Sequence, residues 1–407
     1  MGKRLSKLFK TVDGQGNLPK WFKTAALLLD SISIGSLIIE LPDKRRFLFS
    51  SENPGPEGVL LVRHKDFFTR LLREGENGFS EAYMDEWWDT PDLLMLLDFM
   101  LANKIVVEGT LPGARLVRFY ENFVHWLRSN TKRQAKKNIS AHYDLGNKFY
   151  ENWLDKTMTY SSALFDKKTK SLEDAQRNKY SRICEVLKLK PGDKVLEIGC
   201  GWGGFMEHAI KNNDVFVKGL TISEKQLNYA SNRMNIAGLY ENGEVVLQDY
   251  RDEKGLYDAI VSIEMFEAVG EKYWPDYFKT LSNSLKSGAR ATLQIITISE
   301  EFFPEYRKSV DFIQKYIFPG GMLPSDSALK GEFEAVGLKK VDQKEFGKSY
   351  SKTLRIWHNN FNAVWSDISS QGFDERFKRM WNFYLASCAA FFESETGNVV
   401  QLTLQKD

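Results

Sequence analysis

The sequence predicts an α/β fold: an open, mostly parallel sheet covered by helices on both faces and preceded by a small α+β accessory domain. Short apolar runs at 194–198, 215–220, 244–247, 257–263 and 290–298 alternate with helical stretches. This alternation is typical of a parallel sheet buried between two helical layers. A glycine-rich turn at 199–204 follows the first run, where doubly wound sheets bind cofactors. Two further runs, 336–341 and 398–404, are predicted to extend the far edge of the sheet.

The composition is that of a globular protein of two or three domains, with 407 residues, 43% hydrophobic and 27% charged. Three cysteines, Cys184, Cys200 and Cys388, cannot form a disulfide framework, which favours a reducing compartment. The five histidines lack the spacing of a zinc site, so no metal is predicted. The net charge of +2 favours no class of partner, and no nucleic-acid partner is predicted.

The N-terminal region contains no predicted membrane span. Its most apolar segment, 25–41, is interrupted by Asp30 and ends with Glu40 and Pro42. The segment is too short and too polar to cross a bilayer, and no small-residue cleavage site follows it. We therefore expect a cytoplasmic protein that associates peripherally with the inner face of the cell membrane.

Residues 1–112 are predicted to form the accessory domain. Residues 35–41 and 47–49, joined by a turn at 43–46, have the pattern of a β-hairpin. Helices are expected over 65–73 and 91–102.

Basic and apolar residues share helical spacing over 113–137, which is predicted to be a linker helix between the domains. The segment contains one acidic residue, Glu121, and seven basic residues: Arg115, Arg118, Arg128, Lys132, Arg133, Lys136 and Lys137. Apolar residues at 116, 119, 120, 123, 126 and 127 would line one face of the helix. Two interpretations stay open: a helix that shows its basic face to water, or an amphipathic helix lying on an anionic membrane surface.

Two stretches between predicted strands, about 301–332 and 346–396, exceed ordinary loops. The second is rich in aromatic residues: Trp357, Phe361, Trp365, Phe373, Phe377, Trp381, Phe383 and Tyr384. We predict that both stretches form helical caps over a substrate cavity, so that residues 138–407 form one cofactor-binding domain with a substrate cap.

The segment 195–204, VLEIGCGWGG, has the pattern of a strand, a glycine turn and the start of a helix over 205–211. Gly199, Gly201 and Gly203 permit positive φ and a close approach of the backbone to a ligand. No Lys-Ser or Lys-Thr pair follows the glycines, which excludes a triphosphate-binding P-loop. Glu197 places a carboxylate beside the loop, which favours a cationic ligand over a pyrophosphate.

The ends of the next two strands differ from those of an NAD-binding fold, which would carry an acid for the ribose after the second strand. Thr221, Ser223 and Gln226 offer neutral hydrogen-bonding groups there instead. Gln248 and Asp249 follow the third strand, and Asp249 could accept a hydrogen bond from an adenine amine. Together with the carboxylate beside the glycine turn, this pattern predicts S-adenosylmethionine as the cofactor.

Eight motifs then occur in order along most of the chain, from about residue 60 to the end. They are HYDLGNKFY (142–150), MTYSSALF (158–165), LKPGDKVLEIGCGWGG (189–204), TISEKQ (221–226), LQDYRD (247–252), MFEAVG (265–270), YIFPGGMLPS (316–325) and ERFKRMWNFYL (375–385). Together they resemble the cyclopropane-fatty-acyl-phospholipid synthases. The resemblance implies a Rossmann-like class I methyltransferase sheet, and methyl transfer to the double bond of an unsaturated acyl chain in a membrane phospholipid.

The resemblance also implies a mechanism. The alkene attacks the sulfonium methyl, a carbocation forms on the neighbouring carbon, and a base removes a proton from the new methyl as the ring closes. In the family the base is a bicarbonate ion held by a Cys, a Glu, a His and a Tyr. The glutamate corresponds to Glu267 and the tyrosine to Tyr350, whereas Ser162 replaces the cysteine and the histidine falls at about Ile295. Ring closure therefore competes with a methyl or methylene branch.

Three tyrosine and serine residues are also placed by this resemblance. Tyr143, Tyr160 and Ser161 are expected near the methionine part of the cofactor. Glu267 has two open interpretations: a carboxylate that orients a ligand or acts as a base, or a structural carboxylate. Glu264 would share a helix face with Glu267 and is expected on the cofactor side or in solvent.

Two other functions stay open. One is a small-molecule amine N-methyltransferase of the same fold, which needs only a general base; the other is a lipid-binding protein that has lost catalysis. The basic segment 113–137 and the accessory domain favour a lipid. The expected partners are an unsaturated phospholipid and an anionic membrane surface, and a homodimer is left open.

Overall fold

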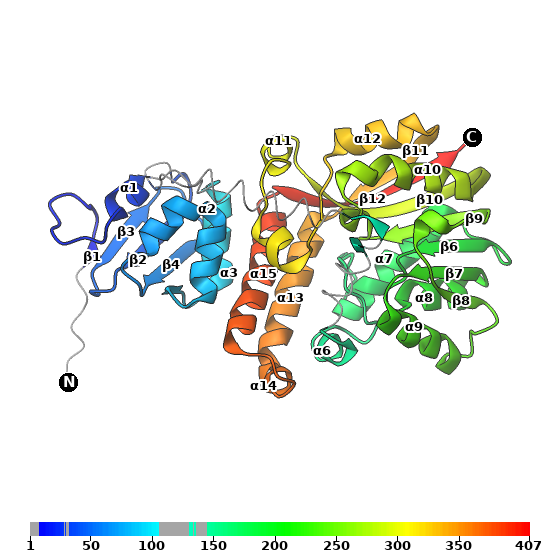
Figure 1. The fold of residues 1–407 in the computed structure, drawn as a ribbon, viewed down its shortest axis with the longest axis horizontal. Coiled ribbons are helices and arrows are strands. Elements are labelled where there is room, and N and C mark those ends of the chain that lie inside the picture. Colours follow the sequence, from blue (N-terminus) through cyan, green and yellow to red (C-terminus); the bar gives the residue numbers. More distant parts are fainter. Residues whose placement is uncertain (1–7, 28, 30–31, 106–129, 133, 136–144) are drawn as a thin grey trace. The chain divides into compact units, whose positions relative to one another are not determined.

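The computed structural model describes residues 8–27, 29, 32–105, 130–132, 134–135 and 145–407 (Figure 1). The chain divides into two compact units. The first is drawn from residues 1–123, 309–312 and 372–394, and the second from 124–308, 313–371 and 395–407. Each unit is described by itself below.

The second unit is built on a seven-stranded sheet of order β11-β12-β10-β9-β6-β7-β8 (Figure 1). Its strands are β6 (Lys194–Ile198), β7 (Phe216–Thr221), β8 (Gly243–Leu247), β9 (Tyr257–Ile263), β10 (Leu285–Ile298), β11 (Leu338–Glu345) and β12 (Gly397–Lys406). The five strands from β8 to β10 pair in parallel, whereas β12 runs antiparallel to both β10 and β11. The predicted Rossmann-like sheet is confirmed, and each of its seven predicted strands is present.

Helices flank this sheet. The longer ones are α7 (Leu172–Leu187), α8 (Gly204–Asn213), α9 (Glu224–Ile236), α10 (Trp274–Ser284), α12 (Asp326–Ala335) and α13 (Gly347–Ala363). The shorter ones are α6 (Asn147–Glu151), α11 (Phe303–Tyr306) and α14 (Trp365–Ser369), with single turns at Tyr250–Asp252, Phe266–Ala268, Glu271–Tyr273 and Ile313–Ile317.

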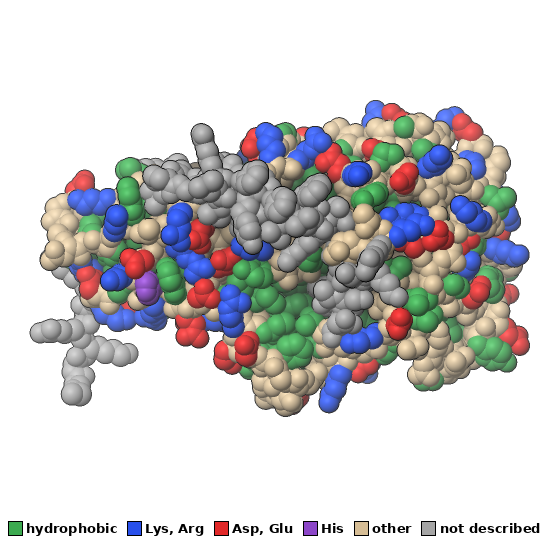
Figure 2. Space-filling model, in the orientation of Figure 1, with side chains coloured by type: hydrophobic (Ala, Val, Ile, Leu, Met, Phe, Trp, Pro, Cys, Tyr) green, Lys and Arg blue, Asp and Glu red, His purple; other side chains and the backbone are tan. Residues whose placement is uncertain are grey.

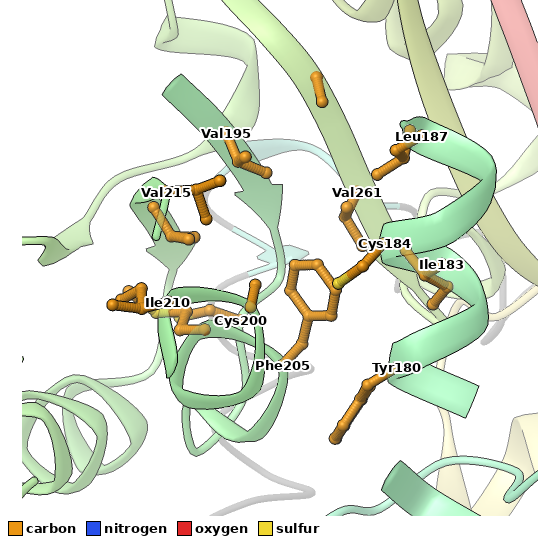
Figure 3. Close-up of a cluster of buried hydrophobic side chains, with 14 of the residues drawn as sticks. Tyr180, Ile183, Cys184, Leu187, Val195, Cys200, Phe205, Ile210, Val215 and Val261 are labelled. Atoms are coloured by element: carbon orange, nitrogen blue, oxygen red, sulfur yellow. The ribbon is translucent and has the colours of Figure 1, made fainter. Parts of the chain in front are cut away.

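A buried apolar cluster joins α7 and α8 to the central strands (Figure 3). Ile183 of α7 and Phe205 of α8 pack with Val195, Val217 and Val261 of the sheet, and each is at most 1% exposed. Burial of each such side chain contributes about 1.5–3 kcal/mol. The helix after the glycine turn is thereby held firmly against the sheet, which fixes the turn itself.

The first unit contains a five-stranded sheet of order β1-β3-β2-β4-β5. Its strands are β1 (Leu8–Phe9), β2 (Ser36–Glu40), β3 (Arg46–Ser50), β4 (Glu57–Val62) and β5 (Trp88–Asp89), and its helices are α1 (Phe22–Leu27), α2 (Phe67–Met84), α3 (Leu93–Ala102) and α15 (Glu375–Glu393). Strands β2 and β3 pair antiparallel, as the predicted hairpin requires.

Helix α15 belongs with the N-terminal region. Arg379 donates hydrogen bonds to the backbone oxygens of Tyr83 and Trp88, and Phe383 packs its ring against Phe79 and Tyr83. The predicted cap 346–396 is therefore divided, because α13 and α14 lie in the second unit and α15 in the first. The domain boundaries differ from the predicted ones for a physical reason: an apolar helix face shows that a helix is buried, but not against which surface.

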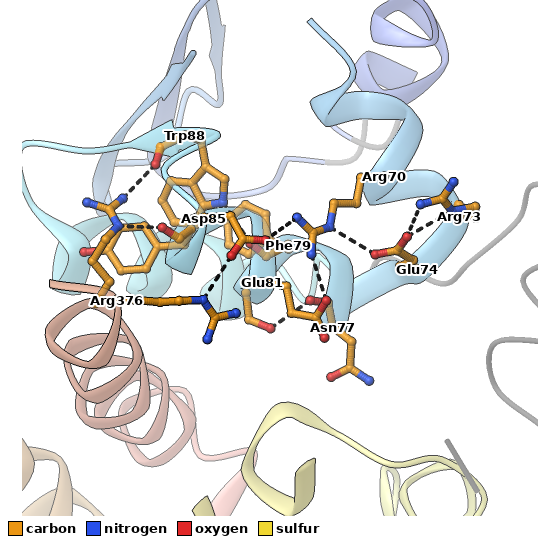
Figure 4. Close-up of polar contacts among 12 residues, drawn as sticks. Arg70, Arg73, Glu74, Asn77, Phe79, Glu81, Asp85, Trp88 and Arg376 are labelled. Atoms are coloured by element: carbon orange, nitrogen blue, oxygen red, sulfur yellow. Dashed lines mark hydrogen bonds and ion pairs between the residues drawn. The ribbon is translucent and has the colours of Figure 1, made fainter. Parts of the chain in front are cut away.

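A charged cluster stabilises α2, which is kinked at Gly75 (φ 61°) (Figure 4). Arg70, before the kink, donates to Glu74 and, across the kink, to Glu81 and Asp85 at 2.8 Å each. Asp85 also accepts a hydrogen bond from Arg376 of α15. One guanidinium thus ties both halves of the helix together, and its partner Asp85 joins them to α15.

The predicted linker helix 113–137 lies almost entirely outside the described residues. Of its basic residues, the structure describes Lys132, which is exposed and forms an ion pair with Asp252. No helix in the described part of the chain is long and apolar enough to cross a membrane. On the face shown in Figure 2, Lys and Arg side chains are interspersed with Asp and Glu.

Candidate active site

The glycine turn after β6 has the predicted backbone conformation. The φ angles of Gly199, Gly201 and Gly203 are 83°, 53° and 80°. The N–H groups of Gly199 and Cys200 donate to the Leu220 oxygen of β7, at 3.0 and 2.9 Å. A β-carbon at position 201 would meet no atom within 4 Å, so the turn has open space beside it. The turn is thus fixed to the neighbouring strand and leaves room for a ligand.

Glu197 of β6 is 2% exposed, and its Oε2 atom is buried without a hydrogen-bond partner. Burial raises the pKa of this carboxyl well above its ordinary value, against the opposing charges of Lys179 and Arg233. A buried carboxylate oxygen without a donor is costly. The ammonium group of S-adenosylmethionine supplies both a donor and a positive charge, so this side chain fits the predicted cofactor.

The polar residues at and after the end of β7 lie together as the sequence analysis expected. Thr221, Ser223 and Gln226 are buried, and the Thr221 hydroxyl donates to Gln226 Oε1 at 2.9 Å. Ser223 caps α9 by accepting a hydrogen bond from the Gln226 N–H. Gln248 joins them through its N–H, which donates to the Thr221 oxygen at 2.9 Å. These contacts order the edge of the sheet next to the glycine turn.

Asp249 follows β8 and pairs with Arg251, whose Nε and Nη2 atoms lie 2.8 and 2.7 Å from its two carboxylate oxygens. Burial alone would raise the pKa of Asp249, but the hydrogen bonds from Arg251 outweigh burial and lower it. The carboxylate therefore stays ionised as an acceptor. Its proposed contact with the adenine amine stays a prediction.

The segment that carries Tyr160, Ser161 and Ser162 is held by α7. Lys179 Nζ donates to the Ser161 hydroxyl at 2.7 Å, and Gln176 Nε2 donates to the Ser161 backbone oxygen at 3.0 Å. The Ser162 hydroxyl donates to the Ala163 oxygen, so it is engaged within its own segment. Tyr143, predicted beside this segment, lies outside the described residues.

Tyr160 lies in an aromatic cluster that reaches the glycine turn. Its ring centroid is 5.3 Å from those of Tyr150 and Trp357, and Tyr150 lies 5.0 Å from Trp202 of the turn. Tyr350 of α13 completes the cluster, 6.0 Å from Trp357 and edge-on to it. Aromatic faces attract cations, so this cluster is suited to a positively charged ligand or intermediate.

Glu264 is placed differently from the prediction. It follows β9 directly and precedes the turn Phe266–Ala268, so it shares no helix face with Glu267. Its Oε1 atom accepts hydrogen bonds from the Ser162 N–H at 2.8 Å and from Gln294 Nε2 at 2.7 Å. The Tyr350 side chain also hydrogen-bonds to this carboxylate. Glu264 is therefore part of the polar centre of the site and not a solvated residue.

Sequence reasoning missed these contacts because the partners lie far apart in the chain. The signal that could have found Glu264 is its position: an acidic residue at the carboxyl end of a central parallel strand, where ligands bind.

Glu267 lies close to Glu264. Its Oε1 atom accepts a hydrogen bond from the Ile296 N–H at 2.5 Å, and its Oε2 atom is buried without a partner. Burial, and then the charge of Glu264, raise the pKa of Glu267 to about 8. The donor beside this carboxylate is a backbone N–H, one residue after the position at which the resemblance placed the family histidine. The site thus holds two carboxylates whose charges interact.

Comparisons with known proteins agree with this geometry. The family model of mycolic acid cyclopropane synthetase matches residues 130–402. The chain is 35% identical to the cyclopropane-fatty-acyl-phospholipid synthase of Escherichia coli (strain K12) over 388 residues, covering 90% of this chain and 95% of that protein. It is 34% identical to a tuberculostearic acid methyltransferase of Mycobacterium tuberculosis over 374 residues, covering 87% of this chain and 84% of that protein.

Among solved structures, a mycolic acid cyclopropane synthase complexed with SAH and CTAB is similar, with a TM-score of 0.63 and 31% identity, covering 67% of this chain and 98% of that chain. The fold, the glycine turn with its buried carboxylate, and these relatives lead to one conclusion. The chain belongs to the cyclopropane synthase family, and it is an S-adenosylmethionine-dependent methyltransferase.

Proposed function

We propose that the protein transfers the methyl group of S-adenosylmethionine to the double bond of an unsaturated acyl chain in a membrane phospholipid. The product is a cyclopropane or a methylene-branched chain, each of which gains one CH₂ and releases a proton; a saturated methyl branch needs an external reductant as well. The observation that carries the proposal is the pair of carboxylates, Glu264 and Glu267, beside the glycine turn. Attack by an alkene creates a carbocation, which a fixed anion stabilises.

An amine N-methyltransferase is the second candidate. Methylation of an amine creates no carbocation and needs only one general base. Two interacting carboxylates, together with the aromatic cluster of Tyr160, Tyr350 and Trp357, exceed that requirement. The lipid substrate is therefore preferred.

We assign roles to the site residues as follows. Residues of the glycine turn and Glu197 hold the methionine part of the cofactor, and the residues after β7 and β8 hold its adenosine part. The cofactor supplies an electrophilic methyl group on a sulfonium. Glu267 lies beside Glu264, and its raised pKa keeps it largely protonated at neutral pH, so that the Glu264 carboxylate carries the negative charge of the pair. Tyr350 and Ser162 orient the Glu264 carboxylate through their hydrogen bonds.

Tyr160 and Ser161 line the methionine side of the cofactor site, and Tyr143 is assigned there by sequence resemblance alone.

Bicarbonate is not part of this proposal. The Ser162 N–H and the Tyr350 side chain, which would have to hold such an anion, are already bonded to Glu264. Ile295 and Ile296 offer no side-chain donor. The residues present therefore do not fit a bound bicarbonate, and we derive no step through it.

We further propose that the enzyme works from the cytoplasm on the inner face of the membrane. The basic and apolar pattern of residues 113–137 supports this location, because such segments bind anionic lipid.

The test is a lipid analysis of cells that express the protein and grow on methionine with a deuterated methyl group. We expect unsaturated phospholipids heavier by one methylene that retain all the methyl deuterons but one. The Gly201→Val variant serves as the control that lacks cofactor binding. Label in small amines, with none in lipids, would establish the second candidate and exclude the first.

A further inference from the structure

We infer that Glu264 is a further catalytic residue: its side chain is the built-in base that removes the proton from the transferred methyl group, in the place that an external anion would otherwise occupy. The inference rests on the proposed methylation of an alkene, because only a carbocation makes the new methyl group acidic enough to lose a proton.

The position of Glu264 places it beside the methyl donor. It directly follows β9, which lies between β6 and β10 in the sheet. The next residue, Met265, packs against the glycine turn: a β-carbon at Gly199 would lie 2.8 Å from Met265 Cγ. On its other side, Glu264 contacts Ser162 and Gln294. Its carboxylate therefore lies between the cofactor turn and the segment of Tyr160–Ser162.

The carboxylate is held by donors from three separate elements. Ser162 comes from the segment before α7, Gln294 from β10 and Tyr350 from α13. The first two donate to the same oxygen, Oε1, and so fix the orientation of the group. Fixed donors prepare an anion for reaction without any reorganisation of water. Three such donors would also bind a small free carboxylate. In this protein they bind the carboxylate of a side chain instead.

The backbone of Glu264 is strained. Its φ angle is +49°, in the left-handed region that a glycine adopts at no cost. Strained residues persist where the surroundings hold them and cluster at active sites. The N–H of Glu264 donates to the Gln294 oxygen at 2.8 Å, so the strained conformation is held by β10. Glu264 thus keeps its carboxylate at a backbone position whose conformation favours glycine.

Lys179 of α7 is a positioning residue for this base. Its side chain is fully buried, and its Nζ atom donates to the Ser161 hydroxyl, one residue before the N–H that holds Glu264. Burial lowers the pKa of Lys179 to about 7, against the charges of Glu264, Asp155 and Glu197. For Glu264, burial raises the pKa, and Lys179 is the largest influence that opposes the rise. The lysine therefore favours the ionised form of the base.

The step balances. A C–H bond of the transferred methyl breaks, its proton goes to a carboxylate oxygen of Glu264, and its electron pair forms the bond that closes the ring onto the cationic carbon. If the positive charge first moves to the methylated carbon by a hydride shift, the same electron pair forms a methylene double bond. Glu264 becomes a neutral carboxylic acid and later releases the proton to solvent.

The experiment uses the full-length protein, phospholipid vesicles with unsaturated chains, and cofactor carrying a labelled methyl group. Three variants are compared with the wild type: Glu264→Gln, Glu264→Gly and the control Asp258→Asn. Asp258 pairs with Lys286 at the opposite end of the same strand. Turnover is measured in carbonate-depleted buffer and with added bicarbonate or formate, and cofactor affinity is measured by calorimetry.

We expect wild-type turnover to be independent of bicarbonate. Glu264→Gln should lower turnover by at least about 100-fold, the lower range for a general base, with cofactor affinity and the control unchanged. Glu264→Gly should be equally slow, but bicarbonate or formate should restore it with saturation, because glycine suits the backbone and the three donors are left free. Such rescue would not follow from a structural role.

A Glu264→Gln variant with more than half of wild-type turnover would overturn the inference and leave the proposed function standing. Strict dependence of the wild type on bicarbonate would do the same. In the cellular labelling described above, label in an amine with none in lipid would overturn both together.

Discussion

Gln401 of β12 donates a hydrogen bond from its Nε2 atom to the side-chain oxygen of Gln294 on β10, 3.1 Å away. This contact fixes the Gln294 amide, so that its own Nε2 atom points to the Glu264 carboxylate. Strand β12, which pairs antiparallel to β10, thus orients a side chain that contacts the Glu264 carboxylate.

Replacement of Gln401 by Leu should therefore lower turnover without loss of cofactor binding. The Gln294 amide would lose one constraint, and a hydrogen bond of this kind contributes about 0.5–1.5 kcal/mol, so a loss of roughly 2- to 10-fold in kcat is expected. The control is Gln405→Leu, on the same strand but only partly buried and bonded to the Gly288 oxygen. Equal kcat values for Gln401→Leu and the wild type would contradict this role.

Gly201→Val should abolish the binding of S-adenosylmethionine, as measured by titration calorimetry. A side chain at this position would enter the open space beside the turn, which we assign to the cofactor. The matched control is Gly238→Val, because Gly238 also has a positive φ and open surroundings but lies after α9. Both variants carry similar backbone strain. Retained cofactor affinity in both would contradict the assignment of the glycine turn to cofactor binding.

Glu267→Gln should reduce turnover by about 10- to 150-fold, because an interaction with a charged group such as the Glu264 carboxylate contributes about 1.5–3 kcal/mol. Cofactor affinity should change little, because the glycine turn follows a different strand. The measurement is kcat together with the dissociation constant of the cofactor. A fully active variant would remove Glu267 from the mechanism.

The same residue predicts how stability depends on pH. Burial and Glu264 raise the pKa of Glu267 from 4.5 to about 8, and the buried phenol of Tyr277 is the other titratable group influenced by it. The folded protein therefore binds this proton more tightly than the unfolded chain does. This contribution to stability is complete below pH 4.5 and is lost as the pH rises through 8.

Thermal unfolding at about pH 6 and about pH 9 should show this loss in the wild type and a smaller one in Glu267→Gln. Glu271→Gln, which removes a more exposed carboxylate from the same loop, should behave as the wild type does. A pH dependence that is identical in all three proteins would argue against a shifted carboxyl at position 267.

Membrane binding should depend on the basic segment. Each basic residue near an anionic surface contributes about 1 kcal/mol, so reversing four of them to Glu should abolish co-sedimentation with anionic vesicles. The residues are Lys132, Arg133, Lys136 and Lys137. The control reverses four exposed lysines elsewhere: Lys167, Lys168, Lys170 and Lys190. If the first variant binds anionic vesicles as the wild type does, residues 113–137 are a linker without a role in membrane binding.

The central sheet was predictable because buried parallel strands are short, nearly continuous apolar runs. The bounds of β6 and β9 agree with the predicted runs at every residue. Strand β10 begins at Leu285, five residues before its apolar run, since Lys286, Ser287 and Gly288 hide the start and the register shifts after Leu285. Composition cannot reveal a strand whose first residues are polar.

The site was only partly predictable. The glycine turn follows from local sequence, because positive φ and missing side chains belong to single residues. The contacts of Glu264 do not, because Ser162 lies 102 positions away in the chain and Gln294 lies 30 away. Burial and partners of a carboxylate arise only once the sheet has formed, and these decide whether the group is a surface charge or part of the chemistry.

The assignment of α15 to the first unit has a consequence for how the protein is made. Residues 372–394 complete a unit whose other main part is the N-terminal region. A ribosome releases the N-terminal strands first, and domains generally fold in that order during synthesis. Here the apolar faces of α2 and α3 must wait for a helix that emerges after almost the whole chain. We therefore expect the nascent N-terminal region to expose these apolar faces until α15 has been released from the ribosome.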